Sequence, residues 1–196
     1  MTLFWIAISL FLVMDSVGNI PLYMSILKDI PHKRQFIIIL REMVIALFVI
    51  ILFNFAGDGL LRLLHIHPQT VEIAGGLILF LLSLKMIFPS EQETESSYKK
   101  IKEPFIVPLA IPLVAGPAVL ATVMLFSRKV DNSFIMISAI FLSWVASLLI
   151  LLSSPFLSKI LKEKGLMALE RLMGFILVLL AVEMFVNGVL GFSSQK

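Results

Sequence analysis

The chain contains no cysteine, and this absence removes several kinds of chemistry. Without thiols there is no disulfide, no thiolate metal site and no iron–sulfur cluster. The sequence also lacks a phosphate-binding loop, a dinucleotide fingerprint, a zinc-protease motif and a nucleophile elbow. With no catalytic pair evident, the sequence predicts that the protein is not an enzyme and holds no cofactor.

Charge is scarce as well. Only 15% of the 196 residues are charged, 59% are hydrophobic, and the mean hydropathy is +1.03. Soluble domains have about 25% charged residues, and a short chain can bury only part of its surface. The surplus apolar surface must therefore face lipid, which makes the bilayer the expected partner. The net charge of +3 is too small and too dispersed to indicate a nucleic-acid partner.

Six apolar segments are long enough to cross a bilayer as helices, which takes about 20 residues each. A polar stretch at 90–103 separates them into two groups of three. We therefore expect one all-α membrane domain, made of a first three-helix repeat at 1–89, a linker at 90–103 and a second repeat at 104–196. The expected segments are 2–27, 36–57, 69–88, 104–126, 134–157 and 168–190.

The two halves resemble each other when the chain is shifted by 98 residues. The stretch Glu72–Met86 then lies over Glu170–Met184 with 7 of 15 positions identical, and Gly18 lies over Gly116. Because three crossings are an odd number, a duplicated second half enters the membrane from the opposite side. The pattern predicts an inverted repeat, as in many secondary transporters, although chance similarity between apolar stretches is the alternative.

The distribution of Lys and Arg predicts the orientation. One side of the six-segment scheme carries 12 of the 16 basic residues, and the other side carries four. Cytoplasmic loops are enriched in Lys and Arg, so we expect both termini to face outward. The four basic residues on the outer side are Arg62, Arg128, Lys129 and Lys196.

Residues that interrupt helices lie near the middle of the first and fourth segments. The first reads Asp15-Ser16-Val17-Gly18-Asn19-Ile20-Pro21, and the fourth contains Pro108, Pro112 and Ala115-Gly116-Pro117. Proline and glycine disfavour a continuing helix, and backbone freed within a membrane must face protein or a watery cavity. Equivalent breaks in two inverted halves indicate a central solute site; packing kinks are the other reading.

Asp15 stands out because a carboxylate is costly inside a membrane and is a candidate functional group there. It could bind a coupling cation, Na⁺ or H⁺, or the ammonium group of a solute. It could equally cap the second half-helix by accepting an N–H bond from Val17 or Gly18. Asn19 fits the same two roles.

Three motifs resemble the MarC family of bacterial inner-membrane proteins over essentially the whole chain. They are M-D-S-V-G-N-I-P (Met14–Pro21), V-P-L-A-I-P-L-V-A-G-P (Val107–Pro117) and L-E-R-L-M-G (Leu169–Gly174). The family usually has proline where this chain has Ser16. The resemblance implies six helices in two inverted repeats and kinship with transporters of neutral amino acids. It points to Asp15, Gly18, Asn19, Pro21, Pro112, Ala115, Gly116 and Pro117 as site residues, with Ser16 between them.

We therefore expect a secondary transporter of a small polar solute, such as a neutral amino acid, in the bacterial inner membrane. The alternative is a non-transporting multi-pass protein that supports a partner complex. A watery cavity lined by Asp15 and Asn19 would favour the first reading, and a closed core would favour the second. The sequence leaves a homo-oligomer open.

Overall fold

The computed structural model describes residues 2–27, 30–88, 114–130 and 132–193. The described residues form helices and no strand, as the composition predicts. The linker 90–103, Pro108, Pro112 and the first part of the fourth expected segment lie outside them. The helices are α1 (Leu3–Met14), α2 (Ile20–Leu27), α3 (His32–Leu63), α4 (Pro68–Ile87), α7 (Pro117–Lys129), α8 (Ser133–Leu152) and α9 (Ser154–Ser193).

Four of these helices contain stretches long and apolar enough to cross a membrane. They correspond to the second, third, fifth and sixth expected segments, and their side chains are largely exposed to the surroundings of the protein. Such wide exposure of large apolar side chains is unusual on a water-soluble surface and fits contact with lipid. The stretches are Arg34–Leu63, Pro68–Ile87, Ser133–Leu152 and Lys164–Phe192.

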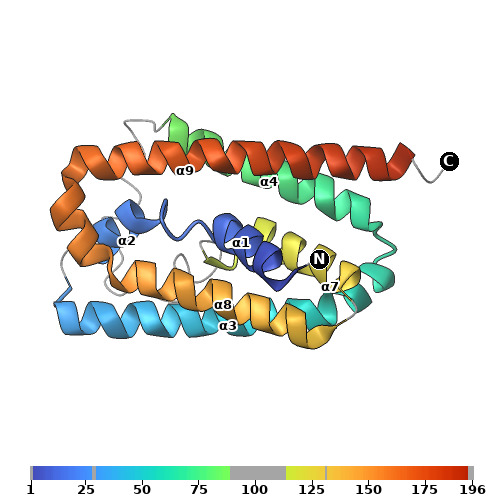
Figure 1. The fold of residues 1–196 in the computed structure, drawn as a ribbon, viewed down its shortest axis with the longest axis horizontal. Helices are drawn as coiled ribbons and strands as arrows, with labels where there is room; N and C mark the ends of the chain where they lie inside the picture. Colours follow the sequence, from blue (N-terminus) through green and yellow to red (C-terminus); the bar gives the residue numbers. More distant parts are fainter. Residues whose placement is uncertain (1, 28–29, 89–113, 131, 194–196) are drawn as a thin grey trace.

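The long helices enclose the short ones in three layers (Figure 1). Helices α4 and α9 pack along one side, and α3 packs against α8 along the other. Between these pairs lie α1, α2 and α7, and α1 packs against both α7 and α8. The broken first segment and the described part of the fourth therefore occupy the middle of the molecule.

Glycines allow α4 and α9 to approach closely. A Cβ atom placed on Gly76 would lie 2.7 Å from the carbonyl oxygen of Ala181, and one on Gly174 would lie 3.1 Å from that of Ser83. Gly76 also faces Met184 and Phe185, and Gly174 faces Met86 and Ile87. Helix backbones approach this closely in membranes where small residues line the contact.

Two expected boundaries differ from the structure. We expected the fifth segment to end at 157 and the sixth to begin at 168, whereas α9 starts at Ser154 and continues through that interval. The interval consists mainly of good helix formers such as Leu, Lys and Glu, and Pro155 stands at the second helical residue, where proline is tolerated. Helix α3 also extends beyond 36–57 at both ends.

Candidate functional site

The first break is built around the backbone of Asp15. This residue adopts φ 46° and ψ 43°, the left-handed conformation, and thereby ends α1 after Met14. Asp and Asn adopt this conformation more readily than other residues with a side chain. The N–H of Asp15 donates to the carbonyl oxygen of Leu12 at 3.0 Å, and its own carbonyl oxygen accepts from the N–H of Asn19 at 3.0 Å. The interruption expected at this point is confirmed.

The side chain of Asp15 then leads the chain into α2. Its Oδ1 atom accepts a hydrogen bond from the backbone N–H of Gly18 at 3.2 Å, as expected, but Gly18 lies in the turn before α2, so the bond stabilises the turn and does not cap the helix directly. A Cβ on Gly18 would meet Asp15 Oδ2 at 2.5 Å and Oδ1 at 2.7 Å, and it would also touch the methyl group of Met86. Any residue larger than glycine at position 18 would therefore displace the Asp15 carboxylate or the Met86 methyl group. Helix α2 begins two residues later, at Ile20.

Two polar atoms at this break are buried without a partner among the described residues. Asp15 is 2% exposed and Ser16 is 0% exposed. The Oδ2 atom of Asp15 and the Oγ atom of Ser16 accept and donate no hydrogen bond within that part of the chain. Leaving a buried polar group unpaired costs about 1–3 kcal/mol, and more when it is charged. The break therefore carries unused capacity for hydrogen bonding or for binding a cation.

Neighbouring polar groups extend this capacity. The side-chain amide of Asn19 donates to the carbonyl oxygen of Met14 at 3.3 Å, so Asn19 bridges the two sides of the break. The carboxylate of Glu170 on α9 lies within electrostatic range of the Asp15 carboxylate. Asp15 therefore has a like charge, and no counter-charge, among its electrostatic neighbours in the described part of the chain.

Glu42 provides a useful contrast, because it is a buried carboxylate with a visible counter-charge. Its Oε1 atom accepts from Nε of Arg41 at 3.0 Å and from a terminal guanidinium nitrogen at 2.7 Å. The Arg41 guanidinium thus supplies a positive charge directly beside the Glu42 carboxylate. No such cation faces Asp15 among the residues that the structure describes. The described residues therefore supply a counter-charge at Glu42, although its Oε2 atom has no partner, and they supply none at Asp15.

The described part of the expected second break belongs to the same apolar core as the first break. Gly116 precedes α7, which begins at Pro117, and the N–H of Leu120 donates to the Gly116 carbonyl oxygen at 3.0 Å. Val114 and Ala115 are fully buried and share the apolar core with Val13 and Met14, the residues just before the first break. Helices α1 and α7 pack together.

The expected site residues differ in how deeply they are buried. Asp15, Ser16, Gly18, Ala115 and Gly116 are buried, and Asn19 and Pro21 are partly buried. Pro117 is exposed, so its role is to start α7. Pro112 lies outside the described residues.

Sequence reasoning did not count Glu170 as a site residue. Its place in the L-E-R-L-M-G motif and its repeat relation to Glu72 were the available signals. Nothing in the sequence indicated that it would face Asp15, because they are 155 residues apart.

A shallow groove of about 220 Å³ lies elsewhere, between α4 and α9. It presents no polar surface, so it offers nothing to orient a polar solute. On a membrane-facing helix pair such a groove suits lipid chains. Its lining residues are Gly76, Leu77, Phe80, Ala181, Val182 and Phe185.

Known proteins that resemble this chain are described as membrane proteins. A family model described as MarC family integral membrane protein matches residues 1–193. The inner membrane protein YhgN of Escherichia coli K12 is 49% identical over 184 residues, 93% of each chain. A membrane protein of Buchnera aphidicola from Acyrthosiphon pisum is 48% identical over 183 residues, again 93% of each chain. One from Chlamydia pneumoniae is 34% identical over 180 residues, 91% of this chain and 89% of the relative. No solved structure matches.

Proposed function

Because the chain belongs to the MarC family of integral membrane proteins, we propose that its broken helices form a solute site and that it is a secondary transporter. The solute class we propose is a small polar molecule with both an ammonium and a carboxylate group, such as a neutral amino acid. We place the protein in the bacterial inner membrane, as the name of the Escherichia coli relative indicates.

The observation that carries this proposal is the pair of unpartnered polar atoms at the first break. Asp15 Oδ2 and Ser16 Oγ are buried near the middle of an apolar segment, where unsatisfied polar atoms are costly. A purely structural kink gains nothing from keeping them. A ligand that supplies a donor or a positive charge would recover the lost free energy.

The break suits both ends of an amino acid. The ammonium group, or a coupling cation (Na⁺ or H⁺), would bind Asp15 Oδ2 with Ser16 Oγ and Glu170 nearby. The carboxylate would lie at the N-terminal ends of α2 and α7, where first-turn N–H groups and the helix dipole attract anions. Both helices start at the breaks, so the two half-sites come from the two halves of the chain.

Pseudo-symmetric packing supports the inverted repeat on which this mechanism rests. Gly76 and Gly174 are separated by the repeat shift of 98 residues, and so are their partners. Gly76 faces Ala181, Met184 and Phe185, and Gly174 faces Ser83, Met86 and Ile87. A contact that maps onto itself when the halves are exchanged is the mark of a two-fold relation.

The same correspondence between the two halves holds for the contacts of the short helices α2 and α7. Helix α7 packs against α4, and α2, which overlaps α7 after the shift, packs against α9. We therefore propose six crossings in two inverted halves. Rocking of these halves about the breaks would give alternating access.

The test is flux through proteoliposomes that contain the purified protein. We expect uptake of labelled alanine, glycine or serine under an imposed Na⁺ or proton gradient. Asp15→Asn should abolish the gradient-driven part, because the neutral amide offers no negative charge to a cation and cannot carry a proton. Glu183→Gln serves as the matched carboxylate-to-amide control, because Glu183 is exposed on α9 and bonds only Asn187 within the described chain. Absence of flux for all three solutes in folded wild-type protein would remove the amino-acid proposal.

One observation favours the alternative, a non-transporting protein that supports a membrane complex. Four residues at the expected breaks are closed to solvent: Asp15, Ser16, Val114 and Ala115 are each at most 2% exposed. A closed core is what that reading expects, although a transporter also closes around its site during each cycle. Isothermal binding of alanine to wild-type protein separates the two, because only the transporter binds it and loses binding in Asp15→Asn.

A further inference from the structure

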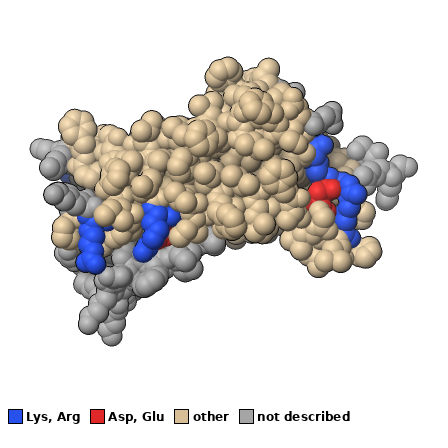
Figure 2. Space-filling view, turned by 90° about the horizontal axis from the view of Figure 1, so that it is seen from below, with Lys and Arg blue, Asp and Glu red and all other residues tan. Residues whose placement is uncertain are grey.

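Charged side chains tie the end of α7 to two long helices. Asp58 on α3 pairs with Arg128 on α7 at 2.9 Å and with Arg62, one turn further along α3, at 2.8 Å. On the other flank of α7, Lys129 pairs with Glu72 on α4 at 3.5 Å. These pairs lie together at one end of the molecule, where Figure 2 shows Lys, Arg, Asp and Glu side chains gathered beside a largely uncharged middle.

Close packing continues from these ion pairs toward the breaks. A Cβ on Gly57 would collide with Met124 of α7, and one on Gly75 of α4 would lie 2.8 Å from Ala121 Cβ. The side chains of α7 between Ala121 and Leu125 are all buried. At this end, the path between the surface and the second break is therefore filled by α7.

The residues of these ion pairs are mostly not repeated at the positions that the shift makes equivalent. After the shift of 98 residues, Asp58 corresponds to Phe156, Arg128 to Ile30 and Lys129 to Pro31, and only Glu72 keeps its character, as Glu170. The counterpart positions around α2 cannot form the same ion pairs. Both ion pairs join an acidic residue of the first half to a basic residue of the second, so separating the two halves at this end must break them.

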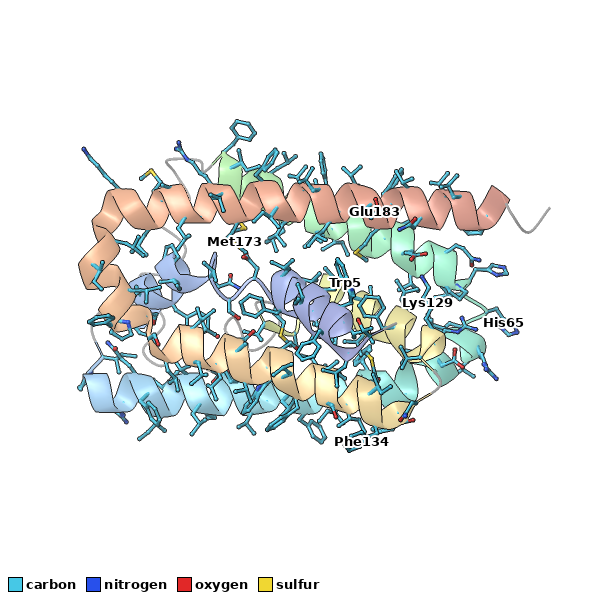
Figure 3. All side chains as sticks on the ribbon, viewed as in Figure 1. Trp5, His65, Lys129, Phe134, Met173 and Glu183 are labelled. Carbon is cyan, nitrogen blue, oxygen red and sulfur yellow. The ribbon has the colours of Figure 1, made fainter. Side chains whose placement is uncertain are left out.

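We propose that Asp58–Arg128 and Glu72–Lys129 form the gate latch of this end of the protein. The latch holds α7 against α3 and α4 and keeps the second break closed from that side. The proposal rests on the transport function above. Partly exposed ion pairs are individually weak, and this suits a gate that must open in every cycle. Figure 3 shows Lys129 of α7 at the end of the molecule where His65, in the turn between α3 and α4, also lies.

The absence of cysteine makes the latch directly testable. A single Thr122→Cys change places a thiol on α7, six residues before Arg128 and so about 9 Å along the helix. Thr122 is 6% exposed, so a membrane-impermeant maleimide should label the cysteine slowly from either side of vesicles. Adding Asp58→Asn and Glu72→Gln should raise the labelling rate about five-fold or more from the latch side, as the open population rises.

Two controls isolate the latch. Glu183→Gln makes the same chemical change on α9, and the labelling rate should stay at its starting value. Exchanging one pair tests the contact itself: Glu72→Lys should raise the rate, and Glu72→Lys with Lys129→Glu should lower it again. Melting temperature in detergent verifies that each variant is folded.

The outcomes separate the latch from transport, because labelling needs no solute. An unchanged labelling rate in the folded Asp58→Asn, Glu72→Gln protein would overturn the latch and leave the solute site untouched. Faster labelling in a protein that moves no solute would keep the gate and overturn the transport proposal. A rise that the exchanged pair fails to reverse would show that charge loss loosens α7 without a specific latch, which also overturns the proposal.

Discussion

At the scale of single residues, Asp15 has two tasks that use different atoms. Its Oδ1 atom holds the turn by accepting the Gly18 N–H, while its Oδ2 atom remains unpartnered among the described residues. A backbone in the left-handed region disfavours most side chains, so position 15 requires a residue that tolerates that backbone and can accept this hydrogen bond. Oδ1 therefore has a structural role, and Oδ2 is the atom that we propose to bind the ligand.

The first prediction concerns Gly18→Ala. The new methyl group would press on both carboxylate oxygens of Asp15, so the carboxylate must shift. Overpacking of this kind costs about 1–3 kcal/mol, and we expect a lower melting temperature by circular dichroism in detergent. Gly59→Ala is the control, because a Cβ there meets nothing within 4 Å and alanine favours a helix. Equal melting temperatures for the two variants would contradict the tight fit at Gly18.

The second prediction concerns Ser16→Ala. Because the hydroxyl is buried without a partner, its removal should leave stability unchanged or raise it by up to about 1 kcal/mol. The melting-temperature increase produced by added solute should shrink, since the ligand loses a contact. A clear loss of stability without solute would instead mean that the hydroxyl has a structural partner.

At the scale of elements, the pairing of α4 with α9 depends on glycines at reciprocal positions. Lipid gives apolar helices little reason to associate, so close backbone contact supplies the attraction. Gly76 and Gly174 each face a carbonyl oxygen and side chains from the partner helix. This pair of helices forms one outer wall of the molecule and leaves the middle layer to the broken segments.

The third prediction follows from that contact. Gly76→Leu and Gly174→Leu should each lower stability by about 2 kcal/mol or more, because the helices must separate. Reciprocal geometry predicts similar losses at the two positions, measured as melting temperature in one detergent. Gly59→Leu controls for the side chain itself. A large loss at only one of the two positions would argue against two-fold packing.

At the scale of the whole molecule, the helices form layers whose charged ends and apolar middle match a bilayer. Long apolar helices lie outside, and the ion pairs of Asp58, Arg128, Glu72 and Lys129 lie at one end. The six crossings proposed above would return the chain to the side on which it began.

The fourth prediction is therefore about topology. Lys196 should face outward with the N-terminus, since the basic residues favour the opposite side. Alkaline phosphatase fused after Lys196 should be active in cells, and green fluorescent protein fused there should remain dark. A fusion after Lys162, on the strongly basic side, should give the reverse pattern. A fluorescent C-terminal fusion would require an odd number of crossings or the opposite orientation.

The sequence by itself determined the class of molecule and the position of its first break. Lipid-facing surface depends on composition, and a helix ends where proline, glycine and a capping aspartate coincide, so both are local properties of the chain. The hydrogen bond between Asp15 and Gly18 was predictable for the same reason. Helix ends were predicted less well, because the helix formers after residue 157 extend α9 through an interval whose polarity suggested a boundary.

Only the tertiary structure decided which distant groups meet. Glu170 comes near Asp15 because α9 packs beside α2, and Lys129 meets Glu72 because α7 packs beside α4. Such contacts depend on how helices pack, and hydrophobic periodicity along one chain does not specify the partner of each face. Packing also determined which glycines leave little room for a side chain, since a Cβ would contact Asp15 and Met86 at Gly18 and the partner helix at Gly76 and Gly174.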